Sequence, residues 1–108
     1  MERIGFKMKI KPEFLDDYVR IHENVDRPLI EEYRQLGVRK YSIFLGEDGT
    51  LFAFLECDDW SAFTRAVEES PNQKTWGAKV YHMFGIKPDE SEGMVLLTEA
   101  FYMDQEKP

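Results

Sequence analysis

The sequence predicts an α+β domain whose elements follow the order β-α-β-β-α-β, and three observations support this prediction. Residues 3–10 alternate between apolar and polar side chains, as a half-buried strand does. Apolar residues recur at helical spacing in two segments, 12–36 and 58–70. Between these segments, two strand-like stretches, 38–45 and 50–57, are separated by the short sequence GEDG, which is typical of a hairpin loop.

The first strand and the helical segment after it are indicated by their apolar positions and prolines. One face of the strand is apolar and carries Ile4, Phe6, Met8 and Ile10. Pro12 suits the first turn of a helix, and helical spacing then continues to Leu36. Pro28 interrupts this pattern because proline removes a backbone donor, so we expect a kink or restart near Asp26, which would cap the second segment.

The hairpin predicts a sheet with two apolar faces. With GEDG as its loop, Tyr41 lies roughly opposite Phe54. One face is then expected to carry Tyr41, Ile43, Phe52 and Phe54, and the other Phe44, Leu51, Ala53 and Leu55. Helices cover only one face, and the uncovered apolar face favours a homodimer packed sheet against sheet.

The second half of the chain completes the order of elements. We expect a helix over 58–70, a short helical piece over 73–84, a polar loop over 85–93 and a final strand over 94–103. The whole is the split βαβ arrangement of ferredoxin-like folds, with an antiparallel sheet and helices on one face. As a dimer it would be a dimeric α+β barrel, formed by a single domain over residues 1–108.

Composition narrows the classes of function. The net charge of −7, without clustered Lys and Arg, weighs against nucleic acid and anionic membranes as partners. Cys57 is the lone cysteine, so an intramolecular disulfide is impossible. With neither a signal peptide nor an apolar run of membrane-spanning length, we expect a cytoplasmic protein.

The search for chemistry leads to His22, because no phosphate loop, HExxH motif, paired cysteines or nucleophile elbow is present. His22 falls on the same helical stripe as Tyr18, Val25 and Leu29. It is either a core histidine with both nitrogens hydrogen-bonded or a general acid and base in an apolar-walled pocket. The two histidines lie too far apart in sequence to indicate a metal site by themselves, and His82 is expected to be structural.

Aromatic residues accompany His22 as candidate pocket walls. Tyr18 lies one turn before it, and the Tyr41 hydroxyl could reach a ligand from the sheet. Trp76, in a polar helix, is a better candidate wall than Trp60, which we expect in the core. Such walls suit the C–H faces of a sugar ring.

Several segments resemble the L-rhamnose mutarotase family over nearly the whole chain. They are RIGFKMKIKPEFLDDYVRIHENV, LGVRKYSIFL, LFAFLE, QKTW, KPDESE and LLTEAFYM. The resemblance implies a small dimeric enzyme that interconverts the α and β anomers of L-rhamnose without a cofactor or metal. It also implies that His22 donates or accepts the proton, while Tyr18, Tyr41 and Trp76 line the monosaccharide site.

Two positions depart from the family pattern where sugar contacts are expected. Thr75 stands in place of the first of two adjacent tryptophans, and Asp26 in place of another tryptophan. Both changes exchange apolar surface for polar groups, which would shift preference toward L-fucose or another related aldose. The same architecture also serves cofactor-independent monooxygenases, and a non-catalytic dimer that binds a small metabolite is a further alternative.

Overall fold

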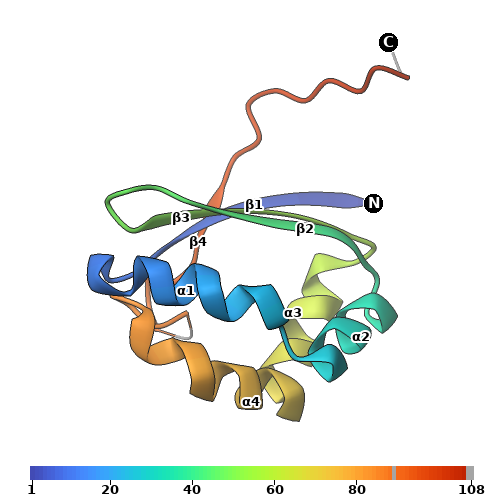
Figure 1. Ribbon diagram of the computed structural model, residues 1–108. Coiled ribbons are helices and arrows are strands. Elements are labelled where there is room, and N and C mark those ends of the chain that lie inside the picture. Colours follow the sequence, from blue (N-terminus) through green and yellow to red (C-terminus); the bar gives the residue numbers. More distant parts are fainter. Residues whose placement is uncertain (89, 107–108) are drawn as a thin grey trace.

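The computed structural model describes residues 1–88 and 90–106 and confirms the ferredoxin-like α+β fold. A four-stranded sheet has the order β2-β3-β1-β4, and every neighbouring pair is antiparallel. The helices lie together on one face of this sheet (Figure 1). The strands are β1 (Glu2–Lys9), β2 (Val38–Leu45), β3 (Thr50–Cys57) and β4 (Val95–Leu97).

The helical layer consists of short segments. The α-helices are α1 (Leu15–Ile21), α2 (Arg27–Gln35), α3 (Trp60–Glu69) and α4 (Pro71–Val80). Three 3₁₀ turns adjoin them: η1 (Pro12–Phe14), η2 (His22–Asn24) and η3 (Tyr81–Met83). Asp59 caps α3 by accepting a hydrogen bond from the backbone N–H of Ala62, which explains why the acids at this point begin a helix.

The predicted break before Pro28 is confirmed, because α1 ends at Ile21 and α2 starts afresh at Arg27. Asp26 occupies the N-cap position of α2, as expected, but its side chain makes no capping hydrogen bond. Its carboxylate instead accepts a hydrogen bond from Lys79 Nζ at 2.6 Å. An ion pair to α4 therefore replaces the cap that the sequence predicted.

The register predicted for the hairpin is wrong by one residue. Gly46 donates its backbone N–H to the Thr50 carbonyl at 2.8 Å, so Gly46 belongs to the closing pair and the loop is shorter than GEDG. Gly49 adopts a positive φ of 91° at its end, a conformation that suits glycine in three-residue hairpin loops. Tyr41 consequently lies opposite Leu55, not Phe54.

This shift changes which residues share a face, because neighbouring side chains alternate across a strand. The face toward the helices carries Tyr41, Ile43, Leu51, Ala53 and Leu55. The outer face carries Phe44, Phe52 and Phe54, which the predicted register divides between the two faces. Leu51 and Leu55 are each 1% exposed, whereas Phe44 is 67% exposed.

The C-terminal strand is shorter than predicted. Only Val95–Leu97 pair with β1, and the chain after them extends away from the sheet (Figure 1). Phe101 is 82% exposed and Met103 is 72% exposed, so this end of the chain finds no apolar cover within its own fold. In the preceding polar loop, Asp89 lies outside the described residues.

Candidate active site

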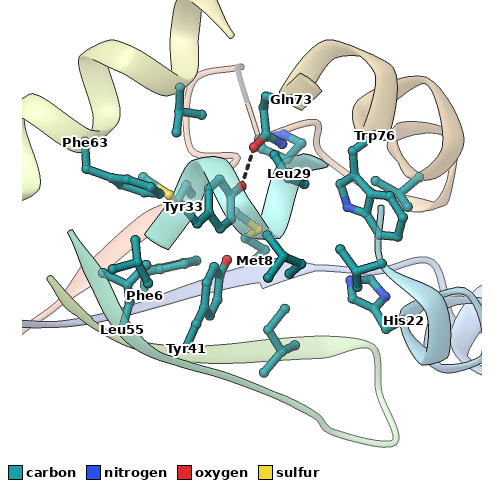
Figure 2. A pocket seen from close by; sticks show the side chains of 18 of the residues that line it. Phe6, Met8, His22, Leu29, Tyr33, Tyr41, Leu55, Phe63, Gln73 and Trp76 are labelled. Atoms are coloured by element: carbon teal, nitrogen blue, oxygen red, sulfur yellow. Dashed lines mark hydrogen bonds between the residues drawn. The ribbon is translucent and has the colours of Figure 1, made fainter. Parts of the chain in front are cut away.

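An open cavity of about 1180 Å³ lies between the inner face of the sheet and the helices. This volume is above the ~300–1,000 Å³ typical of small-molecule sites, so it accommodates a monosaccharide. Polar and aromatic side chains from five elements line it, namely Tyr18, His22, Tyr33, Tyr41, Gln73 and Trp76. Figure 2 shows the last five of these residues. The structure thus gathers His22 and the aromatic residues predicted to accompany it.

His22 owes its orientation to the end of α1. Its backbone N–H bonds to the carbonyls of Val19 and Arg20 as the helix tightens into a 3₁₀ turn. Its ring Nδ1 lies 2.7 Å from the Tyr18 carbonyl oxygen. Because a carbonyl only accepts hydrogen bonds, Nδ1 carries the proton and donates it.

The remaining ring nitrogen, Nε2, is therefore the basic one in neutral His22. Within residues 1–88 and 90–106, no protein group is hydrogen-bonded to Nε2. The His22 ring lines the cavity and is neither fully buried nor fully exposed. An imidazole with one nitrogen fixed and the other open to a cavity has the arrangement that a general acid and base requires.

Two aromatic rings flank His22. Tyr18 is tilted against it with ring centroids 4.2 Å apart, and Trp76 meets it edge-to-face at 5.3 Å and 87°. Both rings are about 95% buried and line the cavity, so Trp76 belongs to the core as well as to the cavity wall. Lys79 lies over Trp76, with Nζ 5.9 Å from the ring centroid, and its ion pair with Asp26 links the end of α4 to the start of α2.

Tyr41 enters the cavity from β2, and its hydroxyl is directed inward (Figure 2). Its ring forms part of the wall of the open cavity, and 40% of the residue is exposed. Protein atoms nevertheless surround the hydroxyl. Burial raises the pKa of Tyr41 to about 12. Burial, with the nearby Tyr41, also raises the pKa of Tyr18 well above that of an ordinary phenol. Both phenols are therefore neutral hydrogen-bond donors at neutral pH.

Thr75 and Asp26 are not brought into the cavity with the other predicted residues. Thr75 is exposed on α4, and its hydroxyl donates to the Pro71 carbonyl at 3.0 Å, within its own helix. Asp26 is engaged by Lys79. Neither residue is among the described residues that line the cavity, so the predicted sugar contacts of both find no support in this placement.

Tyr33 and Gln73 form a polar pair that the sequence analysis missed. The Tyr33 hydroxyl on α2 donates a hydrogen bond to Gln73 Oε1 on α4 (Figure 2). The Tyr33 ring stacks on Tyr41, with centroids 6.2 Å apart and planes at 20°. A polar-tipped aromatic at helical spacing with Leu29, and a glutamine one turn before Trp76, were the available signals.

The described part of the chain contains neither a cluster of metal ligands nor a membrane-spanning helix. No group of three or more His, Cys, Asp or Glu side chains there is arranged to hold a metal ion. No helix among residues 1–88 and 90–106 has the length and apolar character needed to cross a membrane.

Comparisons with known proteins agree with the geometry. The family model described as L-rhamnose mutarotase matches residues 3–103. An L-rhamnose mutarotase of Oceanobacillus iheyensis is 32% identical over 96% of this chain and 100% of its own. The crystal structure of an L-rhamnose mutarotase from Formosa agariphila is 30% identical, covers 96% of this chain and 100% of its own, and superposes with a TM-score of 0.82.

A more distant structure shares only the fold. An antibiotic biosynthesis monooxygenase is 19% identical, with a TM-score of 0.59 over 92% of this chain and 98% of its own. At that identity the likeness extends to the ferredoxin-like architecture and not to the site.

Proposed function

Since the chain belongs to the L-rhamnose mutarotase family and is therefore a carbohydrate isomerase, we propose that it interconverts the α and β anomers of L-rhamnose, with His22 as general acid and base. The observation that supports this role is the open Nε2 of His22 at a cavity wall, between Tyr18 and Trp76. A histidine of the core would instead have both nitrogens tied to protein groups.

The proposed reaction moves protons and breaks one ring bond. Nε2 of His22 accepts the proton of the anomeric hydroxyl while the ring oxygen receives a proton from a second donor. The bond between the anomeric carbon and the ring oxygen breaks, and the anomeric carbon becomes an aldehyde. After rotation about the adjacent carbon–carbon bond, the reverse transfers close the ring as the other anomer and restore both groups.

Tyr41 and Tyr18 are the proposed sources of the second proton and of contacts to the ring hydroxyls. Their raised pKa values keep both phenols protonated near neutral pH, so they act as donors and not as bases. Tyr41 lies on the sheet and Tyr18 on α1, so these donors approach a bound ring from different elements. His22 is then the group that exchanges protons with the anomeric hydroxyl.

Trp76 is the proposed wall for an apolar face of the sugar. Its indole lies edge-to-face with His22, and aromatic faces of this kind pack against C–H groups of pyranose rings. L-Rhamnose is the substrate we propose first, and L-fucose the second. The exchange of family tryptophans for Thr75 and Asp26 motivates testing both sugars, although neither residue is among the described residues that line the cavity.

The experiment follows anomer equilibration of freshly dissolved L-rhamnose and L-fucose by saturation-transfer NMR. We expect acceleration by the wild type and a loss of ~100- to ~10,000-fold in His22→Ala, the range of general acid–base contributions. His82→Ala is the matched control, because His82 is exposed and packs on Phe14 at 5.3 Å. If every sugar equilibrated at its rate in buffer, the proposed catalysis would be contradicted, and a non-catalytic sugar-binding protein would be the remaining alternative.

We also propose that the protein is a homodimer joined through the outer sheet face. Phe44 and Phe52 are 67% and 47% exposed on that face, and the helices lie on the other side (Figure 1). The extended C-terminal segment adds Phe101 and Met103 without cover. Exposed apolar surface of this extent is typical of protein interfaces.

A further inference from the structure

The cavity has polar groups on two sides. The proposed reaction involves His22 on one side but neither Tyr33 nor Gln73 on the other. His22 and Trp76 lie at one side of the view in Figure 2, and Tyr33 with Gln73 lies across the cavity from them. Within the second group, Tyr33 belongs to α2 and Gln73 to α4, the helix that also carries Trp76.

The hydrogen bond between Tyr33 and Gln73 fixes which atoms remain available. The Tyr33 hydroxyl donates a hydrogen bond to Gln73 Oε1, so the side-chain amide of Gln73 has a defined orientation. Burial raises the pKa of Tyr33, with nearby Tyr41 contributing next, so this phenol stays protonated and keeps the bond. The Tyr33 oxygen can still accept a hydrogen bond, and the Gln73 amide nitrogen has two protons to donate.

These remaining groups have no partner within the described chain. Among residues 1–88 and 90–106, no protein acceptor is hydrogen-bonded to the side-chain nitrogen of Gln73, and no donor to the Tyr33 oxygen. Both residues line the cavity and are half-buried. The pair thus offers one acceptor and one donor side by side, which is the complement of a sugar hydroxyl.

We propose that the Tyr33–Gln73 pair is a specificity-determining element that binds the C4 hydroxyl of the pyranose, across the ring from the anomeric carbon held at His22. C4 follows from the geometry of the ring: it is the carbon farthest from the anomeric carbon, and the pair lies across the cavity from His22. This inference rests on the proposed mutarotase function and specifies how its site chooses among sugars. L-Rhamnose and L-fucose differ in configuration at C2 and C4, so a group that binds the C4 hydroxyl separates them.

Glu32 provides a matched control, because it makes a similar link between the same helices outside the cavity. Its carboxylate accepts hydrogen bonds from Ser70 Oγ at 2.5 Å and Asn72 Nδ2 at 3.3 Å. Glu32 is not among the described residues that line the cavity. A change at Glu32 therefore loosens α2 from α4 without removing a group that faces the sugar.

The test compares kcat/KM for L-rhamnose, its 4-deoxy analogue and its 2-deoxy analogue in the wild type, Tyr33→Phe, Gln73→Ala and Glu32→Ala. The wild type is expected to prefer L-rhamnose over the 4-deoxy sugar by about tenfold, as for one lost hydrogen bond. In Tyr33→Phe and Gln73→Ala this preference should fall toward one, because the group that binds the hydroxyl is impaired. Glu32→Ala should keep it, and the preference over the 2-deoxy sugar should persist in every variant.

The ratio of two sugars in one sample does not depend on how much protein is folded, so partial unfolding cannot imitate the expected result. An unchanged preference over the 4-deoxy sugar in both cavity variants would overturn the inference. So would an equal collapse of the preference over the 2-deoxy sugar. If the wild type accelerated no sugar, the proposed function itself would fail, and the inference with it.

Discussion

The two faces of the β2–β3 hairpin are made from alternate residues of the same strands, yet they differ in chemistry and surroundings. On the inner face, Tyr41 lines a cavity opposite the helices, and Leu51 is 1% exposed. On the outer face, Ser42 and Phe44 lie on the side that the helices leave open, and Phe44 is 67% exposed. Strand alternation thus separates the proposed sugar site from the proposed dimer surface by a single step along the chain.

A charge on the outer face is expected to have the largest effect. In a two-fold dimer, Phe44→Glu removes one buried ring from each copy, and at ~1.5–3 kcal/mol per ring the association weakens by about 3–6 kcal/mol. Sedimentation velocity over a range of concentrations measures the shift to monomer. Ala62→Glu, which adds the same charge on exposed α3, should leave the dimer intact. A Phe44→Glu protein that dissociates like the wild type would show that this face is not the interface.

The inner face should control the stability of the monomer. Leu51→Ala opens a cavity in the core and is expected to lower the free energy of unfolding by about 2–5 kcal/mol in urea. Its neighbour Phe52 points outward and is 47% exposed. In the monomeric Phe44→Glu background, Phe52→Ala should change that free energy by no more than about 0.5 kcal/mol. Equal losses at both positions would contradict the assignment of faces.

Substitutions at two neighbouring residues of β2 should likewise have different effects on catalysis, because the residues lie on opposite faces. Tyr41→Phe removes one hydroxyl from the cavity and is expected to lower kcat/KM for L-rhamnose by a factor equivalent to about 1 kcal/mol. Ser42→Ala removes a hydroxyl from the opposite face and should have no effect on turnover. A greater loss in Ser42→Ala than in Tyr41→Phe would contradict the placement of the sugar at the inner face of the sheet.

Alkaline pH should lower the stability of the protein through ionisation of Tyr41 on the inner face, and this effect should be smaller than those of the substitutions above. The pKa of Tyr41 is about 12 in the folded protein, against an ordinary value of 10.0. Its contribution to stability is complete below pH 10 and is lost as pH rises toward 12, because the unfolded state releases the proton first. Urea midpoints across this window should fall less steeply in Tyr41→Phe than in the wild type. Parallel curves for the two proteins would indicate that the Tyr41 pKa is not raised by folding.

The order and kind of elements were predictable because local patterns determine them. Alternation places Phe6 and Ile10 in the core, and Pro28 forces a new helix to begin. The register of the hairpin was not predictable from GEDG alone. It depends on whether Gly46 belongs to the loop or to the closing pair, and its hydrogen bond to the Thr50 carbonyl places it in the pair.

The site was predictable where residues are close in sequence and less so where the fold joins distant segments. His22 and Tyr18 share one helical stripe, the positions of Tyr41 in a strand and Trp76 in a polar helix made them candidate pocket residues, and the resemblance to the mutarotase family implied the same four residues. The pair of Tyr33 and Gln73 joins two helices 40 positions apart, and nothing local in the sequence indicates that hydrogen bond. At Asp26 the local pattern predicted a helix cap that does not form. The tertiary structure places Lys79 beside this carboxylate, which accepts a hydrogen bond from Lys79 instead.

The most direct test of the central claim is nitrogen-15 NMR of the neutral His22 ring. We expect the tautomer with its proton on Nδ1, held by the Tyr18 carbonyl, and an Nε2 resonance that moves when L-rhamnose is added. The ring resonances of the exposed His82 should stay in place. A proton on Nε2, or an Nε2 resonance that saturating L-rhamnose leaves unchanged, would contradict the account.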